Sequence, residues 1–184
     1  MPDTPEFTQP SLHDLLDELD RSNAHSDHLV AGLTDDQIRW RPTADSSAIG
    51  WHLGHQAAVA HYLLRNLVVA EPLIDPDIDA LMDSATPEPL RGELPTLKRL
   101  SEYRSVVAQR IHDHVVRIHN ADVDAPHQLR IIATTLLVTI VNHNYQHAKW
   151  IGEVRTNTFD LDAPPLPASP WLTTVDGYKM VAQH

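Results

Sequence analysis

Four long segments of the chain carry apolar residues at the three- and four-residue intervals of an amphipathic helix. The first segment begins after Ser11, whose side chain can form a capping box with that of Asp14, and Gly32 ends it. Leu12 and Leu15 start its apolar stripe. This pattern predicts a helix between Ser11 and Gly32.

Three further helices follow from the same pattern. The second is expected to start after a cap at Ser46 or Ser47 and to carry the sequence AIGWHLGHQAAVAHYLLRNLVVA. The third is expected from about Pro95, a residue that suits a first helical turn, to about His119. The fourth is expected over residues 128–155. Four long helices with one long connection predict an all-α protein, an antiparallel four-helix bundle.

The segments outside these helices are shorter or broken by proline. A short turn is expected to start at Thr34, and residues 71–93 should form a loop with a short helix at 77–84. The tail should be extended and proline-rich, with a last helical turn at residues 169–171. We therefore expect a bundle over residues 1–156 and a tail, 157–184, that packs on the bundle or on a partner subunit.

Composition narrows the classes of function. The 184 residues contain 25 acidic against 14 Lys and Arg residues, a formal charge of −11, which argues against nucleic-acid partners and against an anionic membrane surface. The first ten residues are acidic and polar, unlike a secretion signal, so we expect a cytoplasmic protein. Because there is no cysteine, neither a thiolate metal ligand nor a protein-borne sulfur nucleophile is available, whereas histidine is abundant at 13.

Two histidines lie on the apolar stripe of the fourth helix. His143 and His147 are four residues apart, so their side chains share one face and can bind one metal ion. Two core histidines hydrogen-bonded to their neighbours are the alternative. Each imidazole in an apolar seam needs partners for its ring nitrogens, and bundle interiors commonly hold metal sites, so we favour the metal.

A third ligand is expected from the second helix, which offers His52 and His55. Periodicity places His52 nearer the centre of that helix's apolar stripe and His55 nearer its edge, and it does not choose between them. His61, one and a half turns after His55, is expected to face away from it.

The other histidines are weaker candidates. His25 and His28 have a usable three-residue spacing but no partner motif. His112 and His114 are two apart on a helix, so they cannot chelate together, and a solvated face is the simpler interpretation.

The stretches GLTDDQIRWRPTADSSAIGWHLGHQAAVAHYLL and HNYQHAKWIGEVR resemble the DinB superfamily of metal-binding four-helix bundles, over roughly residues 11–156. The family's second-helix ligand follows an Ile-Gly-x-x-x-x-His run, which Ile49 and Gly50 place at His55. The resemblance therefore implies His55, His143 and His147 as the metal ligands, with His52 as the fallback. Trp-His-Leu-Gly-His is also similar to the N-terminal bundle of the ergothioneine-forming sulfoxide synthases, whose large second domain this chain lacks.

The resemblance implies a chemistry as well. Relatives in the superfamily include low-molecular-weight-thiol transferases and a mycothiol-dependent isomerase. The expected cofactor is one divalent ion, zinc first, with nickel or iron as alternatives. The expected function is a thiol S-transferase or isomerase that uses a thiol such as mycothiol or bacillithiol and an electrophilic small molecule. A metal-binding stress or accessory protein without turnover is the alternative.

Relatives also pair as dimers, so a homodimer is expected. Trp150, Trp171 and Tyr178 are the aromatic residues that could lie at its interface. The alternative is that the tail covers the core of its own bundle.

Overall fold

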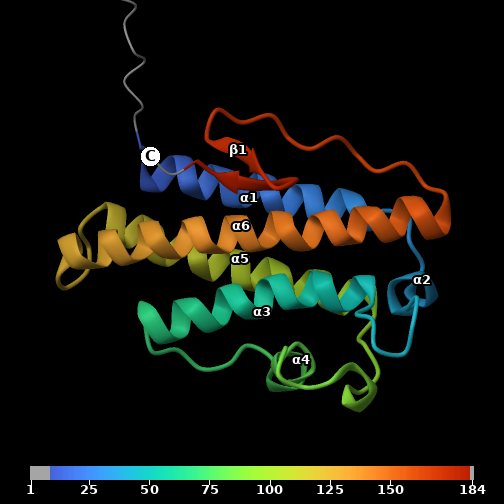
Figure 1. Ribbon diagram of the computed structural model, residues 1–184. Helices are drawn as coiled ribbons and strands as arrows, with labels where there is room; N and C mark the ends of the chain where they lie inside the picture. The colour runs from blue at the N-terminus through green and yellow to red at the C-terminus, as the bar shows by residue number, and fades with distance from the viewer. Residues whose placement is uncertain (1–8, 183–184) are drawn as a thin grey trace, which may run out of the picture.

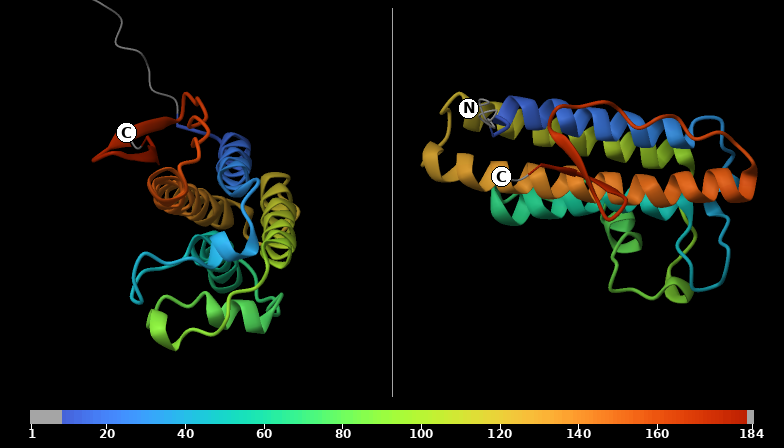
Figure 2. Two further views of the ribbon diagram at one scale, coloured as in Figure 1. Left: turned by 90° about the vertical axis from the view of Figure 1, so that its right-hand side faces the viewer. Right: turned by 45° about the horizontal axis from the view of Figure 1, so that its top comes forward.

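The computed structural model describes residues 9–182, and the polar N-terminal segment considered above lies mostly outside that range. Four long helices pack side by side (Figures 1 and 2). They are α1 (Leu12–Val30), α3 (Ile49–Leu67), α5 (Leu97–His119) and α6 (Pro126–Phe159). The predicted all-α four-helix bundle is confirmed.

The helices form two parallel pairs that run antiparallel to one another. Arg104 on α5 contacts Leu53 on α3, and Arg110 contacts His61 further along both helices, so α3 and α5 share a direction. Figure 1 shows α1 and α6 running the opposite way. The long connection between α3 and α5 allows this arrangement because it returns the chain to the end of the bundle at which α3 begins.

The starts of α1 and α3 differ in whether the predicted capping side chain forms its bond. The capping box of Ser11 and Asp14 is present at the start of α1, as predicted. The predicted cap of α3 is wrong: Ala48 is the N-cap and makes no side-chain hydrogen bond. Ser47 instead donates its hydroxyl hydrogen to the carboxylate of Glu88, a residue of the long connection.

The other two long helices differ from the predicted bounds. Thr96 caps α5, so this helix begins just after Pro95 rather than at it. α6 begins at Pro126, whose ring suits the first helical turn, and it continues to Phe159. It ends where Asp160 adopts a left-handed conformation, with φ 53°.

The predicted short elements are present, with one addition. α2 (Asp35–Arg39) starts at a capping box of Thr34 and Gln37. α4 (Pro76–Leu81) is the short helix expected within the long connection. A 3-10 turn, η1 (Glu88–Leu90), was not predicted.

The tail ends in a β-hairpin that the pattern analysis did not predict. β1 (Leu172–Val175) pairs antiparallel with β2 (Tyr178–Val181), and Asp176 and Gly177 at the turn have φ of 51° and 81°. Residues 170–171, where a last helical turn was expected, form a single turn closed by the Leu172 amide, which donates to the Ser169 carbonyl at 3.4 Å, and this turn leads directly into the hairpin. The hairpin lies beside α6 (Figure 2), and the Val181 amide donates to the side-chain oxygen of Asn142 at 2.7 Å.

The four apolar stripes meet in one core, which also contains a buried polar network. Arg104 is 6% exposed and donates to the Leu53 carbonyl and to the Gln56 side chain. Gln56 in turn donates to the Asn144 carbonyl of α6, so the network joins three helices. Within residues 9–182, no helix is long and apolar enough to cross a membrane.

Candidate metal centre

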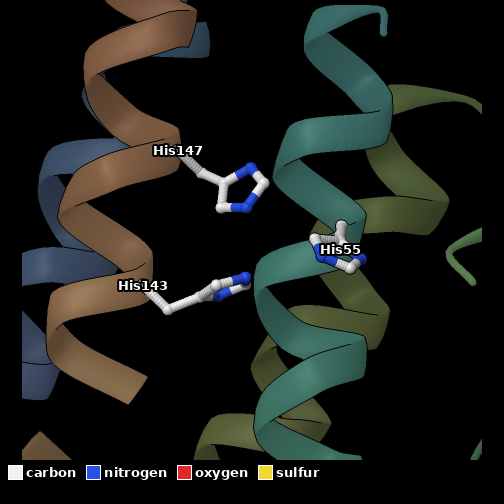
Figure 3. A group of neighbouring side chains, drawn as sticks. All are labelled: His55, His143 and His147. Carbon is white, nitrogen blue, oxygen red and sulfur yellow. The ribbon is translucent and has the colours of Figure 1, made fainter. Parts of the chain in front are cut away.

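Three histidines from two helices converge in the bundle interior (Figure 3). His143 and His147 project from adjacent turns of α6 toward His55 on α3. Their ring centroids lie 4.3 Å apart within α6, and each lies 5.1 or 5.0 Å from that of His55. One ring nitrogen from each residue lies within 4.8 Å of the others, so the three could hold one metal ion.

The hydrogen bonds around His55 and His143 fit a metal ion between them. Nδ1 of His55 lies 2.7 Å from the Met82 carbonyl, an acceptor only, so this nitrogen carries the hydrogen and Nε2 keeps its lone pair. Nδ1 of His143 is buried and has no hydrogen-bond partner among the described residues. A buried imidazole nitrogen normally has a partner, and an ion would supply one.

Burial keeps these imidazoles neutral. It lowers the pKa of His143 to about 4 and that of His147 to about 2, and it also lowers the pKa of His55. For His143 and His147, the neighbouring imidazoles lower the pKa further. At neutral pH all three rings are therefore neutral, with one ring nitrogen free of hydrogen, and this is the form in which histidine binds metal.

His52 lies beside this group rather than within it. Its Nδ1 is 2.8 Å from Nδ1 of His147, and its ring centroid is 5.1 Å from that of His147. It also borders a surface cavity of about 510 Å³ together with Trp40 and Trp150. The structure thus places His55, and not His52, with His143 and His147. Of these three residues, His52 contacts His147.

A stacked layer covers one side of His55, and sequence reasoning missed it. The Trp51 ring stacks on the His55 ring, with centroids 4.3 Å apart and an interplanar angle of 15°. The Arg91 guanidinium lies 4.1 Å from the Trp51 ring centroid and pairs with Glu88, which is 7% exposed. Arg91 and Glu88 come from the proline-rich connection, where no periodicity indicates which side chains turn inward.

Two other histidines depart from the sequence-based expectation. His114 does not lie on a solvated face: it is 14% exposed and hydrogen-bonds Glu71 at 2.7 Å. His61, which was expected to face away from His55, is buried on α3 and borders the same cavity between α3 and α4 as His55. His112 and His28 are exposed, as expected of weak candidates.

The chain matches the family model of the DinB superfamily over residues 18–151. It belongs to the DinB superfamily. The matched range contains all three histidines and ends before the hairpin tail. A comparison with curated proteins gave no match.

Proposed function

We propose that this DinB-like protein is a metal-dependent thiol S-transferase or isomerase whose sulfur comes from a low-molecular-weight thiol. The observation that carries the proposal is the convergence of His55, His143 and His147 on one point. Three neutral imidazoles bind a divalent ion and leave a coordination position for a substrate, which is typical of catalytic sites. Because the chain has no cysteine, a sulfur nucleophile has to be a co-substrate.

An ion held there would lower the pKa of a thiol that binds it, so that the thiol reacts as a thiolate at neutral pH. Zinc is the ion we expect, with nickel and iron as alternatives that also accept imidazole. The thiol is expected to resemble mycothiol or bacillithiol, and its reaction partner is an electrophilic small molecule.

The protein's own groups orient the three rings. The Met82 carbonyl fixes which nitrogen of His55 carries the hydrogen. His52 contacts Nδ1 of His147 and leaves Nε2 of that ring without a hydrogen bond among the described residues. Trp51 covers the face of His55 and keeps water from it. These contacts hold the rings in place before an ion or substrate arrives.

The thiol step can be tested on protein loaded with cobalt(II), whose absorption spectrum reports a bound thiolate. Mycothiol, bacillithiol and cysteamine would each be titrated while the new charge-transfer band is recorded. His143→Ala should abolish the band, and His127→Ala, which removes an exposed imidazole outside the group, should not. Thiol consumption with a panel of electrophiles then measures turnover.

Two results separate this proposal from its alternative. Thiol binding with turnover supports the enzyme. Stoichiometric metal with neither thiol binding nor thiol consumption contradicts it and favours a DinB-like metal-binding protein without turnover.

A further inference from the structure

A cavity of about 710 Å³ lies between α3 and the segment that contains α4. His55 borders it at one end, next to Met82, and His61 and Asp79 border it further along α3 and α4. The cavity therefore adjoins a residue of the candidate metal centre but extends well beyond it. Its volume is in the range that holds a small organic molecule.

Most of the cavity wall is apolar. The apolar side chains that border it include Val59, Leu63, Leu73, Pro76, Ala80 and Met82. Around it, Tyr62 is 63% exposed and Leu73 is 41% exposed, so apolar surface continues outward from the cavity. A ligand that fills this space gains most of its binding free energy from an apolar body.

The charged groups in the cavity wall are mainly carboxylates. Asp79 accepts a hydrogen bond from the Tyr103 hydroxyl at 2.5 Å through Oδ1, and its Oδ2 is buried with no hydrogen-bond partner among the described residues. Asp83 is a second carboxylate, near His55, on an exposed residue. The wall thus carries two carboxylate charges, one of them on an exposed residue that a ligand can reach.

Three basic side chains lie in or near the cavity wall. Arg65 donates from Nε to the Glu71 carbonyl at 2.6 Å. Burial lowers the pKa of His61, so this ring is uncharged at neutral pH although it lies 3.9 Å from Asp79. Arg110, 3.4 Å from His61, pairs with Glu71. The cavity wall itself therefore carries two negative charges, on Asp79 and Asp83, and one positive charge, on Arg65, so its net charge favours a cationic ligand over an anionic one.

We propose that this cavity binds a small apolar molecule that carries a protonated amine, with the amine near Asp79 or Asp83. The placement of this molecule as the second substrate, beside the thiol, rests on the proposed function. The binding itself does not, because the carboxylates that attract the amine, Asp79 and Asp83, are not metal ligands in that proposal.

Three probes of nearly equal size test the charge preference: benzylammonium, benzyl alcohol and benzoate. Each would be titrated into the metal-free, full-length protein at pH 7, with binding followed by protein chemical shifts in NMR spectra. Benzylammonium should bind about 10-fold more tightly than benzyl alcohol, because a charged donor meets a carboxylate. Benzoate should bind more weakly than either.

Matched variants locate the effect. Asp79→Asn and Asp83→Asn keep side-chain size and remove one negative charge each, so together they should reduce the advantage of benzylammonium over benzyl alcohol to less than about threefold. Asp124→Asn, which removes an exposed carboxylate in the α5–α6 loop, should leave it unchanged. Ala80→Phe, at an exposed residue that borders the cavity, should weaken all probes that bind there.

The proposal is overturned if no probe binds, if benzoate binds as tightly as benzylammonium, or if the amine preference survives in the double Asn variant. Since these titrations use metal-free protein, their failure leaves the metal and thiol proposals standing. Conversely, a protein that binds the amine but no metal would retain this inference and lose the proposed function.

Discussion

His52 on α3 and His147 on α6 contact each other through their Nδ1 atoms, at 2.8 Å. Both rings are neutral at pH 7, since burial lowers the pKa of His52 to about 4 and that of His147 to about 2. One Nδ1 therefore donates and the other accepts. When His147 is the donor, its Nε2 lone pair is available to an ion, so one of the two tautomer arrangements of this contact is compatible with metal binding.

Replacing His52 should weaken metal binding without abolishing it. His52→Ala removes the ring nitrogen that contacts Nδ1 of His147, and we expect an affinity loss of about 10- to 100-fold with a stoichiometry still near one. His52→Gln, which keeps an acceptor, should recover part of the loss. Competition with a chelator of known affinity measures both. Complete loss of metal in His52→Ala would instead make His52 a ligand, and unchanged affinity would remove its positioning role.

Gly54 permits the close approach of α3 to Met82, the residue whose carbonyl holds His55. A Cβ at Gly54 would lie 2.6 Å from Sδ of Met82 and 3.1 Å from Leu100. Gly54→Ala should therefore lower the free energy of unfolding by about 1–3 kcal/mol and weaken metal binding as Met82 moves.

Gly152→Ala on α6 is the matched control for that substitution. Its Cβ would lie 3.5 Å from Leu29, an ordinary contact, so the gain in helix propensity should stabilise the protein by about 0.5–1 kcal/mol. Urea unfolding of the two variants measures the difference. Equal changes in the free energy of unfolding would show that Met82 does not pack tightly against Gly54.

The metal-free protein should lose stability in mild acid. The pKa of His52 and of His143 is about 4 in the folded protein, against about 6.5 when unfolded, so the unfolded chain binds more protons between these values. The free energy of unfolding should thus fall as pH decreases from about 6.5 to about 4, by up to about 1.4 kcal/mol per pH unit for each imidazole. Urea unfolding at intervals across this range measures it.

His52→Gln isolates the histidine contribution from that of the carboxylates. The variant should show a shallower dependence on pH across the same window. An identical pH dependence in the variant would mean that His52 is not buried in its neutral form.

The hairpin tail should stabilise its own bundle. Val181 on β2 is 3% exposed, so Val181→Ala should cost about 1–2 kcal/mol in the free energy of unfolding. Val175→Ala on β1, where the side chain is 47% exposed, should cost little. The cost at Val181 should not depend on protein concentration. A cost that falls on dilution would place the tail on a partner subunit, because dilution separates the subunits and removes the contact from both proteins.

The helices were predictable because their information is local. Ser11 and Asp14 form their capping box from neighbouring residues, and the apolar stripes mark which faces turn inward. Ser47 escaped prediction because its partner is Glu88, 41 residues away. The hairpin also has a local signal, which helical periodicity does not include: Asp176-Gly177 between two short apolar runs favours a two-residue turn with positive φ.

The candidate metal site also has features that the sequence predicts and features that it does not. The spacing of His143 and His147 follows from helix geometry alone, but the choice of His55 over His52 required the family pattern. The surroundings of the site, including the Met82 carbonyl and the Arg91–Trp51 stack, depend on how the long connection folds back over α3. No sequence periodicity encodes that path.

Elemental analysis of protein purified without a histidine tag tests the central claim most directly. We expect about one equivalent of divalent metal in the unmodified protein and in His127→Ala, and almost none in His55→Ala or His143→Ala. Retention of a full equivalent in both of the last two variants, or no metal in the unmodified protein even after reconstitution, would contradict the three-histidine metal site.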